Sequence, residues 1–293
     1  MRESWRATQP DRVRRVREVC RWAIHFPVTQ CRLWQMRSQL RKSSPPLAKS
    51  VGLAVITYNR LDFLKNCTRS LDRHQWGHAD VRVVVDDSSD QSGYETFLRD
   101  CAQRGIHVIR LPCNQGVAAA KNAALRHLLE RKCQYLFLME DDMLLISSLA
   151  LRYYIDWAHR FQIHHLNFGL HGRKNRWREM LIRHANDWLL CYPALVGAFS
   201  FYTARAVNEV GYLDERFRNA LEHVEHTYRI AKAGLTTPFW CFADHPLNTD
   251  LLREQPGSLT HSVIRNADWS QHLQEAREYW IAKHGGWLPE RPY

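Results

Sequence analysis

Between residues 51 and 143, strand-like and helix-like segments alternate along the chain, and this feature constrains the fold more than any other. Short apolar runs predict buried strands, and apolar residues at helical spacing predict the helices that connect them. This alternation predicts an α/β fold with a mainly parallel sheet flanked by helices. The predicted strands are Val51–Thr57, Val81–Val85, Ile106–Ile109 and Tyr135–Met139. The predicted helices contain Leu61, Leu64 and Leu71, then Tyr94, Phe97, Leu98 and Cys101, and then Val117–Leu129.

The second half of the chain is less regular, so its elements are predicted one by one. We expect a helix at Leu145–Phe161 and another at Ala220–Ala233, which Gly234 would end. Asp268 would cap a last helix that runs to Lys283. The expected strands are Leu166–Leu170, Glu179–Arg183 and Trp188–Tyr192. The main domain is therefore expected to span residues 51–293.

Residues 1–50 form a basic segment that differs in character from the rest of the chain. They hold ten Arg and two Lys against three acidic residues, so they carry +9 of the total formal charge of +11. Asp11 is a suitable N-cap for a helix over residues 11–26, which Pro27 would end. A second helix is expected over residues 29–42, followed by the linker Ser43-Ser44-Pro45-Pro46.

A basic amphipathic extension suits several kinds of partner. Residues 1–42 fit peripheral contact with an anionic membrane surface. They also fit an acidic protein, and nucleic acid is the least favoured of the three. The extension would equally pack on its own domain or on a second copy of the chain, so a homo-oligomer stays open.

Composition excludes several classes of protein. No run of eighteen apolar residues is present, so no membrane span is expected. The Arg-rich N-terminus has no apolar h-region, so a secretory signal is not expected. The eight cysteines are scattered with no Cys-x-x-Cys pair, which argues against a zinc ribbon and against a disulfide framework. Reduced, mostly buried thiols and a cytoplasmic location are expected.

Polar motifs follow the four predicted strands of the first half, close to the point where each strand ends. In a parallel sheet, ligands bind beyond the carboxyl ends of the strands, so these motifs should meet. They supply an aromatic residue, a carboxylate pair, a cation and an acidic cluster, which together match the needs of a nucleoside diphosphate. The motifs are Thr57-Tyr58-Asn59-Arg60, Asp86-Asp87-Ser88-Ser89-Asp90, Asn114-Gln115-Gly116 with Lys121-Asn122, and Glu140-Asp141-Asp142.

The acidic cluster Glu140-Asp141-Asp142 directly follows an apolar strand. Adjacent carboxylates repel one another unless a cation balances them, and hard cations such as Mg²⁺ or Mn²⁺ prefer oxygen ligands. The cluster therefore predicts a metal site that also holds a phosphate-bearing ligand. Taken alone, it would equally be an acidic solvated turn, and Asp86-Asp87 alone would equally be an Asx-type turn. No Gly-x-Gly-x-x-Gly or Walker-type motif is present, which disfavours dinucleotide cofactors and ordinary NTPase chemistry.

In order and spacing these motifs resemble the family 2 glycosyltransferases, which have a GT-A fold, over roughly residues 51–245. The resemblance implies a nucleotide-binding half at residues 51–143 and an acceptor-binding half at residues 144–293. Later in the chain it is carried by Val210-Gly211-Tyr212-Leu213-Asp214-Glu215-Arg216-Phe217, by Glu222-His223-Val224-Glu225, and by Arg229 to Gly234.

The resemblance also implies roles for single residues. Asp142 would bind a Mn²⁺ or Mg²⁺ ion, and His245 or His261 would supply a further ligand. Lys121 stands where the family usually has Arg, so it keeps the charge but loses the planar fork. The residues implied in donor binding are Thr57, Tyr58, Asn59, Asp86, Asp87, Lys121, Glu140 and Asp141.

The catalytic base is implied to lie at Glu222-His223, where the family usually has Glu-Asp. A carboxylate and a neutral imidazole can each take the proton of an acceptor hydroxyl. We rank Glu222 before His223, because a carboxylate needs less adjustment to serve there; His223 would otherwise be a surface or capping residue. A zinc site at His223 and His226 is disfavoured, because the zincin motif places its two histidines four residues apart and not three.

Aromatic and basic side chains of the second half are candidates for the acceptor site. A Trp face is a good platform for a sugar ring, although each Trp taken singly is more simply explained by core packing. The candidates are Trp177, Trp188 and Trp240, with Arg173, Lys174 and Arg176.

The predicted function is that of a metal-dependent, inverting glycosyltransferase. It would move a hexosyl or N-acetylhexosaminyl group from a nucleoside diphosphate sugar, expected to be a UDP-sugar, to a hydroxyl of a glycan, lipid-linked or protein acceptor. Surface glycan or glycolipid assembly is the context that the resemblance implies. The alternative is a non-catalytic GT-A-fold protein that binds nucleotide-sugar and acts as a scaffold through its basic extension.

Overall fold

The computed structural model describes residues 27–43, 46, 50–260 and 269–289. The chain divides into two compact units, residues 1–44 and 45–293. In the first unit the described part holds one helix over residues 27–40, which confirms the second predicted helix of the extension. Pro27 is its first residue, where a missing N–H has no cost. The predicted helix over residues 11–26 lies outside the described residues.

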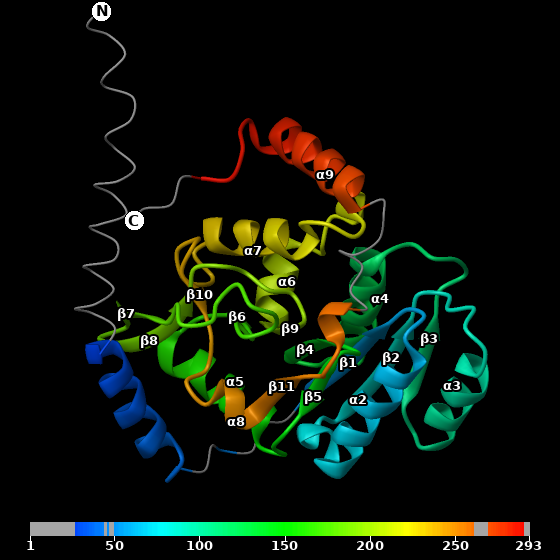
Figure 1. Ribbon diagram of the computed structural model, residues 1–293, viewed down its shortest axis with the longest axis horizontal. Coiled ribbons are helices and arrows are strands. Elements are labelled where there is room, and N and C mark those ends of the chain that lie inside the picture. Colours follow the sequence, from blue (N-terminus) through cyan, green and yellow to red (C-terminus); the bar gives the residue numbers. More distant parts are fainter. Residues whose placement is uncertain (1–26, 44–45, 47–49, 261–268, 290–293) are drawn as a thin grey trace, which may run out of the picture. The chain divides into compact units, whose positions relative to one another are not determined.

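A six-stranded sheet forms the centre of the second unit (Figure 1). Its strands are β1 (Val51–Thr57), β2 (Val81–Asp86), β3 (His107–Arg110), β4 (Tyr135–Glu140), β6 (His165–Asn167) and β9 (Phe199–Thr203), in the order β3-β2-β1-β4-β9-β6. The strands β1 to β4 are parallel, whereas β9 runs antiparallel to both of its neighbours. This mixed, mainly parallel sheet confirms the predicted fold class.

Helices cover both faces of this sheet, which explains why β1 is buried along its whole length. On one face, Ala54 and Ile56 share a hydrophobic core with α4 (Val117–Glu130), α6 (Ala204–Val210) and α7 (Glu222–Lys232). On the other face, Phe199 of β9 contacts Tyr154 of α5 (Ala150–Phe161), with ring centroids 5.2 Å apart. The helices α2 (Leu61–Arg73) and α3 (Tyr94–Gln103) follow β1 and β2, as the sequence predicts.

The second half differs from the prediction in several elements. The helix predicted to begin at Leu145 begins at Ala150, because Met143–Leu145 is strand β5 and pairs with β11 (Leu252–Glu254). The strand predicted at Leu166–Leu170 is the shorter β6. Strand β9 and helix α6 were not predicted. The remaining elements are β7 (Met180–His184), β8 (Asp187–Tyr192), β10 (Phe242–Ala243), α8 (Asn248–Leu251) and α9 (Trp269–His284).

Two predictions from composition can be compared with the structure. The seven cysteines in the described part of the chain are all free, and four of them are buried. No described helix combines the length and the apolar character that crossing a bilayer requires.

A buried histidine at the join between the sheet and α7 makes stability depend on pH. His165 donates from Nδ1 to the carbonyl of Phe201 at 2.8 Å, and its Nε2 lies 2.9 Å from the hydroxyl of Thr227. Burial lowers the pKa of His165 to about 4. Between the ordinary pKa of 6.5 and this value, the unfolded chain binds more protons at this residue than the folded chain does.

The contribution of His165 to the free energy of unfolding should therefore fall as the pH decreases from 6.5 to 4. The slope for one such residue is at most about 1.4 kcal/mol per pH unit. Urea unfolding of His165→Gln across this range should give a shallower pH dependence than the wild type. His74→Gln, at a partly exposed position after α2, should keep the wild-type slope. An equal slope in His165→Gln and the wild type would contradict the account.

Candidate functional site

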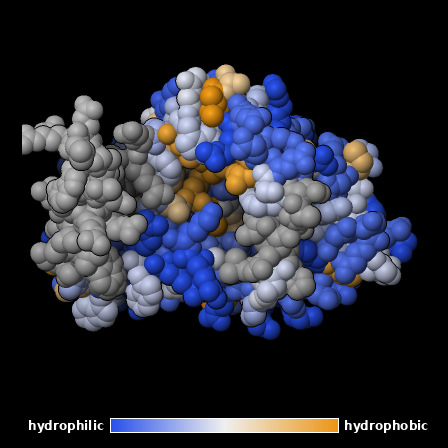
Figure 2. Space-filling model, turned by 45° about the horizontal axis from the view of Figure 1, so that its top comes forward, coloured by the Kyte–Doolittle hydropathy of each residue, from blue (hydrophilic) through white to orange (hydrophobic). Residues whose placement is uncertain are grey.

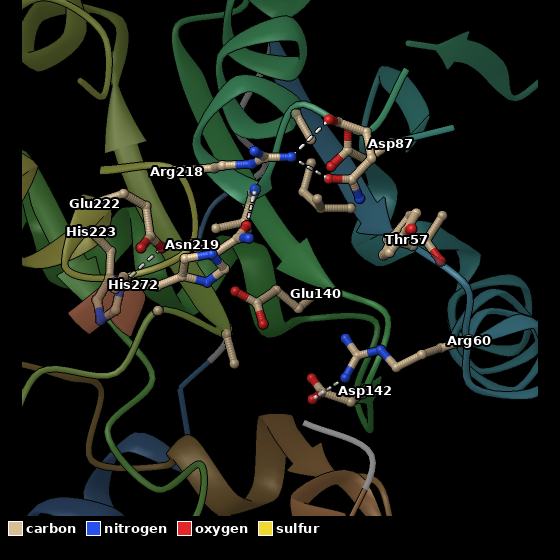
Figure 3. Close-up of a pocket in the computed structure, with 18 of the residues that line it drawn as sticks. Thr57, Arg60, Asp87, Glu140, Asp142, Arg218, Asn219, Glu222, His223 and His272 are labelled. Carbon is tan, nitrogen blue, oxygen red and sulfur yellow. Dashed lines mark hydrogen bonds and ion pairs between the residues drawn. The ribbon is translucent and has the colours of Figure 1, made fainter. Parts of the chain in front are cut away.

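A cavity of about 550 Å³ opens beyond the carboxyl ends of β1, β2 and β4. Its lining includes residues from all four strand-end motifs, with Asn114 from the third, together with Glu222 and His223 from the start of α7. The face shown in Figure 2 is hollowed, with hydrophobic residues inside and hydrophilic ones around them. Figure 3 shows Glu222 and His223 on one side of the pocket, and Arg60 and Asp142 on the other.

Asp87 holds the loop that leads into α4. Its carboxylate accepts the backbone N–H groups of Gln115 at 2.7 Å and Gly116 at 2.8 Å. Burial raises the pKa of Asp87, although these two hydrogen bonds oppose the rise. Gly116 has φ +92°, and a Cβ atom there would lie 2.4 Å from Cγ of Arg218. The loop conformation therefore requires glycine at this position.

Some of the other residues of the first two motifs line the cavity, and others hold the lining residues in place. Tyr58 and Asn59 line the cavity, and 39% of the Tyr58 surface is exposed. Thr57 also lines it, and its hydroxyl donates to Asp141 at 2.7 Å. Asp86 is not among the lining residues; its carboxylate accepts the backbone N–H and the hydroxyl of Ser89. Asp86 therefore stabilises the local turn at Asp86–Ser89, through a bond to the N–H three residues on and not two as in an Asx turn.

Arg60 and His171 neutralise the acidic cluster at the end of β4. The Arg60 guanidinium pairs with Asp141 and, at 3.2 Å, with Asp142. Nε2 of His171 lies 3.3 Å from the same oxygen of Asp142 and 3.7 Å from Glu254. Burial raises the pKa of Asp141 to about 7. Burial also opposes the charge of Asp142, but His171 and Arg60 outweigh it and lower the pKa of that carboxyl.

The residues around Asp142 fit a divalent cation. The second carboxylate oxygen of Asp142, Oδ1, is buried and has no hydrogen-bond partner among the described residues, and Asp142 lines the cavity. Mg²⁺ is commonly held by one or two protein ligands together with substrate phosphates. Residues 27–43, 46, 50–260 and 269–289 contain no group of three or more His, Cys, Asp or Glu side chains arranged as a complete metal site. Asp142 therefore suits a site in which one or two protein ligands hold the cation together with substrate phosphates.

Lys121 lies at the centre of a buried ionic network and does not line the cavity. Its ammonium group donates to Glu140 at 2.9 Å and to the carbonyl of Gly197 at 3.2 Å, and lies 3.4 Å from Glu222. Burial opposes the charge, but Glu140 and Glu222 more than offset this and raise the pKa of Lys121. The residue thus links the end of β4 to the start of α7.

Glu222 and His223 form a hydrogen-bonded pair at the cavity wall. Nδ1 of His223 lies 2.9 Å from Oε1 of Glu222. Burial works against the charge of Glu222, yet His223 and Lys121 hold its pKa down at about 2. An ionised carboxylate only accepts, so Nδ1 carries the proton and Nε2 has the free lone pair. Nε2 makes no hydrogen bond within the part of the chain that the structure describes.

Other sequence candidates lie away from this wall. His245 is buried in the aromatic core beside Tyr153, Tyr154 and Trp157, and burial lowers its pKa to about 3. It is not among the residues that line the cavity. His261 falls outside the described residues. Trp177 is 70% exposed and therefore is not a core residue.

Several lining residues were not assigned roles from the sequence. Arg60 was noted in its motif, and its place directly after a strand was the signal for it. His171 directly follows the strand predicted at Leu166–Leu170, although the observed β6 already ends at Asn167. Arg218 and Asn219 precede α7, whereas Trp269 and His272 come from α9, and only the tertiary fold brings these four residues to the cavity.

Comparison with known proteins supports the predicted resemblance. The model of the family described as "Glycosyl transferase family 2" matches residues 53–185, which confirms the resemblance and assigns this segment to a glycosyltransferase family. No curated protein matches the chain.

Several solved structures are similar to this chain at low sequence identity. S. aureus TarS 1–349 is 13% identical, with a TM-score of 0.48 over 80% of this chain and 72% of its own. A mannosyltransferase from Pyrobaculum calidifontis, solved with GDP-Man and Mn²⁺, is 17% identical, with a TM-score of 0.44 over 92% and 87%. GalNAc-T7, solved with UDP, GalNAc and Mn²⁺, is 12% identical, with a TM-score of 0.47 over 68% of this chain and 43% of its own.

The pairing of His223 with Glu222 depends on the absence of a side chain at Gly197. A Cβ atom there would lie 2.8 Å from Cγ of His223, so Gly197→Ala should displace the ring and break its bond to Glu222. Long-range ¹H–¹⁵N spectra should report the Nδ1–H form of His223 in the wild type, and its loss in the variant.

Gly286→Ala is the matched control, since a Cβ atom there meets nothing within 4 Å. It should leave the His223 signals unchanged. An unaltered Nδ1–H form in Gly197→Ala would show that the close packing does not set the ring position.

Proposed function

We propose that this chain, whose residues 53–185 match the family 2 glycosyltransferase model, transfers a sugar from a nucleoside diphosphate sugar to a hydroxyl acceptor. One observation carries the proposal: a single cavity places a carboxylate–imidazole pair on one side and a cation-balanced acidic cluster on the other (Figure 3). The carboxylate–imidazole pair suits removal of a proton from a hydroxyl, and the acidic cluster with its cations suits the binding of a diphosphate.

The donor would occupy the end of the cavity built by β1, β2 and β4. Tyr58 offers an exposed ring on which a base can stack, and Asp87 offers carboxylate oxygens next to it. Arg60 lines the cavity beside Asp142, the proposed metal ligand, so its guanidinium would donate to the diphosphate held there. A UDP-sugar remains the donor that we propose.

A divalent cation, Mn²⁺ or Mg²⁺, would be held by Asp142, with His171 beside it. When bound, the cation would neutralise charge on the leaving diphosphate. The chain's own contribution is to orient Asp142 through Arg60 and His171, which hold one carboxylate oxygen and leave Oδ1 for a ligand. We retain Asp142 and not His245 as the proposed ligand, because His245 lies in the aromatic core.

His223 is the base that the geometry favours, which reverses the order expected from the sequence. Its Nε2 has the lone pair that a hydroxyl proton needs, while the Glu222 carboxylate orients the ring and would stabilise the imidazolium. As the acceptor oxygen bonds to the anomeric carbon, its proton would pass to Nε2. The bond from that carbon to the diphosphate would break, and the diphosphate would take the electron pair. Attack from the side opposite the leaving group inverts the anomeric centre.

The acceptor and the cellular context are proposed only at the level of their class. A glycan, a lipid-linked sugar or a protein hydroxyl would each serve as acceptor, and surface glycan or glycolipid assembly remains the proposed context. In the described helix over residues 27–40, Val28 is 51% and Trp34 is 68% exposed. An exposed Trp on a basic helix supports peripheral contact with an anionic membrane surface.

Replacing the base should separate turnover from donor binding. His223→Gln should lower kcat by roughly 10²- to 10⁴-fold, the usual contribution of a general base. Its Kd for UDP should stay within about twofold, since it removes no donor contact. Glu222→Gln should also lower kcat but keep the acid limb of the pH–rate profile, which His223→Gln should lose. His107→Gln is the control. Full turnover in His223→Gln with complete loss in Glu222→Gln would make the carboxylate the base.

Removing divalent cations should abolish transfer. In a panel of UDP- and GDP-sugars, a chelator should stop donor turnover, and Mn²⁺ or Mg²⁺ should restore it. Asp142→Asn should weaken the metal-dependent part of UDP binding measured by calorimetry, whereas Asp100→Asn, at an exposed position of α3, should not. Unchanged turnover in chelator would contradict the metal proposal. Donor binding without turnover of any donor would support the scaffold alternative, and neither binding nor turnover would overturn the proposed function.

A further inference from the structure

Residues 173–178, which we name the basic loop, concentrate positive charge at the protein surface. Four of the six residues are cationic, namely Arg173, Lys174, Arg176 and Arg178, and all four side chains are exposed. None of them forms an ion pair with a carboxylate of the described residues. Cations gathered in this way repel one another, and this repulsion is relieved by an anionic ligand.

The basic loop is held in a defined shape by Asn175, which is only 1% exposed. Its amide donates to the carbonyls of Gly169 at 2.8 Å and Ala194 at 2.7 Å, and its oxygen accepts the Ala194 N–H at 3.1 Å. Just before the loop, the Gly172 N–H donates to Glu254 at 2.9 Å. The cations on either side of Asn175 are therefore presented on an anchored segment.

The segment before the basic loop and the segment that Asn175 binds both contain or adjoin residues that line the proposed catalytic cavity. His171, two residues before the loop, lines the cavity and contacts Asp142. Ala194, which Asn175 binds, is followed by the lining residues Val196 and Gly197, and Gly197 packs against His223. The four cations themselves are not among the lining residues. The segment that carries these cations is therefore anchored next to the cavity, and none of the four occupies the space available to the donor.

We propose that the basic loop binds an anionic group, a phosphate or a carboxylate, carried by the acceptor next to the hydroxyl that receives the sugar. This inference rests on the proposed function, because it assigns the class of acceptor for the same cavity. Arg side chains bind such groups through paired donors. Trp177 lies among the cations with 70% of its surface exposed, and it supplies an apolar face for a sugar ring of the same acceptor.

The loop is tested with a fluorescent dextran oligosaccharide and the same oligosaccharide carrying phosphate groups, by anisotropy at low and moderate salt. The wild type should bind the phosphorylated form about tenfold tighter or more, and salt should reduce this preference. Changing all four loop cations to Gln should abolish the preference. Trp177→Ala should weaken the binding of both forms by a similar factor.

Two further variants separate the local site from net charge and from misfolding. A control with Arg73, Arg99, Arg131 and Lys132 changed to Gln makes the same charge change at other exposed positions, and it should keep the preference. A loop variant with its three Arg changed to Lys keeps the charge but loses the paired donors, so it should keep a smaller, salt-dependent preference for the phosphorylated form. Thermal melts should show all variants folded.

Equal binding of the two oligosaccharides by the wild type would overturn the inference, as would equal loss in the loop and control variants. Binding of anionic phospholipid vesicles through the loop cations, without binding of the phosphorylated oligosaccharide, would overturn it in favour of a membrane contact. UDP binding and donor turnover are measured on the same samples. Absence of UDP binding and donor turnover, with the preference for the phosphorylated oligosaccharide intact, would count against the proposed function. It would not count against the inference that the basic loop binds an anionic group.

Discussion

The buried ammonium group of Lys121 is the interaction on which the arrangement of the cavity depends. It lies between Glu140 at the end of β4 and Glu222 at the start of α7, two groups that the chain separates by a long stretch of sequence. Glu222 is buried, and a buried carboxylate is costly without a cationic partner, so its position depends on Lys121 together with its bond to His223. Lys121 thereby fixes the distance between the acidic cluster and the Glu222–His223 pair, although it does not line the cavity itself.

The same constraint divides the cavity into two electrostatic environments. At one end, Arg60 and His171 surround Asp141 and Asp142 with positive charge. At the other, Glu222 keeps its negative charge, because its pKa is held at about 2, and this charge orients the imidazole of His223. An acidic cluster balanced by Arg60 and His171 can hold a divalent cation and a diphosphate, and a carboxylate-backed imidazole stabilises a proton that it receives. The two environments are those that the proposed displacement reaction requires at its two ends.

Much of the first half of the fold could be predicted from the sequence, because its strands and helices are marked by local sequence patterns. Strands such as β1 are continuous apolar runs because helices cover both faces, and the polar motifs stand where these strands end. Asp87 and Asp142 could be placed at the cavity in this way. The same reasoning could not separate Asp86, which supports a turn, from Asp87, which lines the cavity, because both stand at the end of the same strand.

The second half could not be predicted to the same degree, because its decisive contacts are long-range. Strand β5 exists through its pairing with β11, a partner far along the chain. The proposed order of Glu222 and His223 as bases rests on contacts with Gly197 and Lys121, which meet them only in the folded chain. His245, named from its late position in the sequence, lies in the aromatic core and not beside Asp142.

The most direct test of this account is the stereochemistry of transfer. Figure 3 shows the proposed base, His223, on the opposite side of the cavity from Asp142, the proposed site of the leaving diphosphate. With this arrangement, the proposed single displacement would invert the anomeric centre. Proton NMR of the first product formed from an α-linked nucleoside diphosphate sugar should therefore show a β-linkage. An α-linked first product would contradict the assignment of His223 and Glu222 as the groups that activate the acceptor.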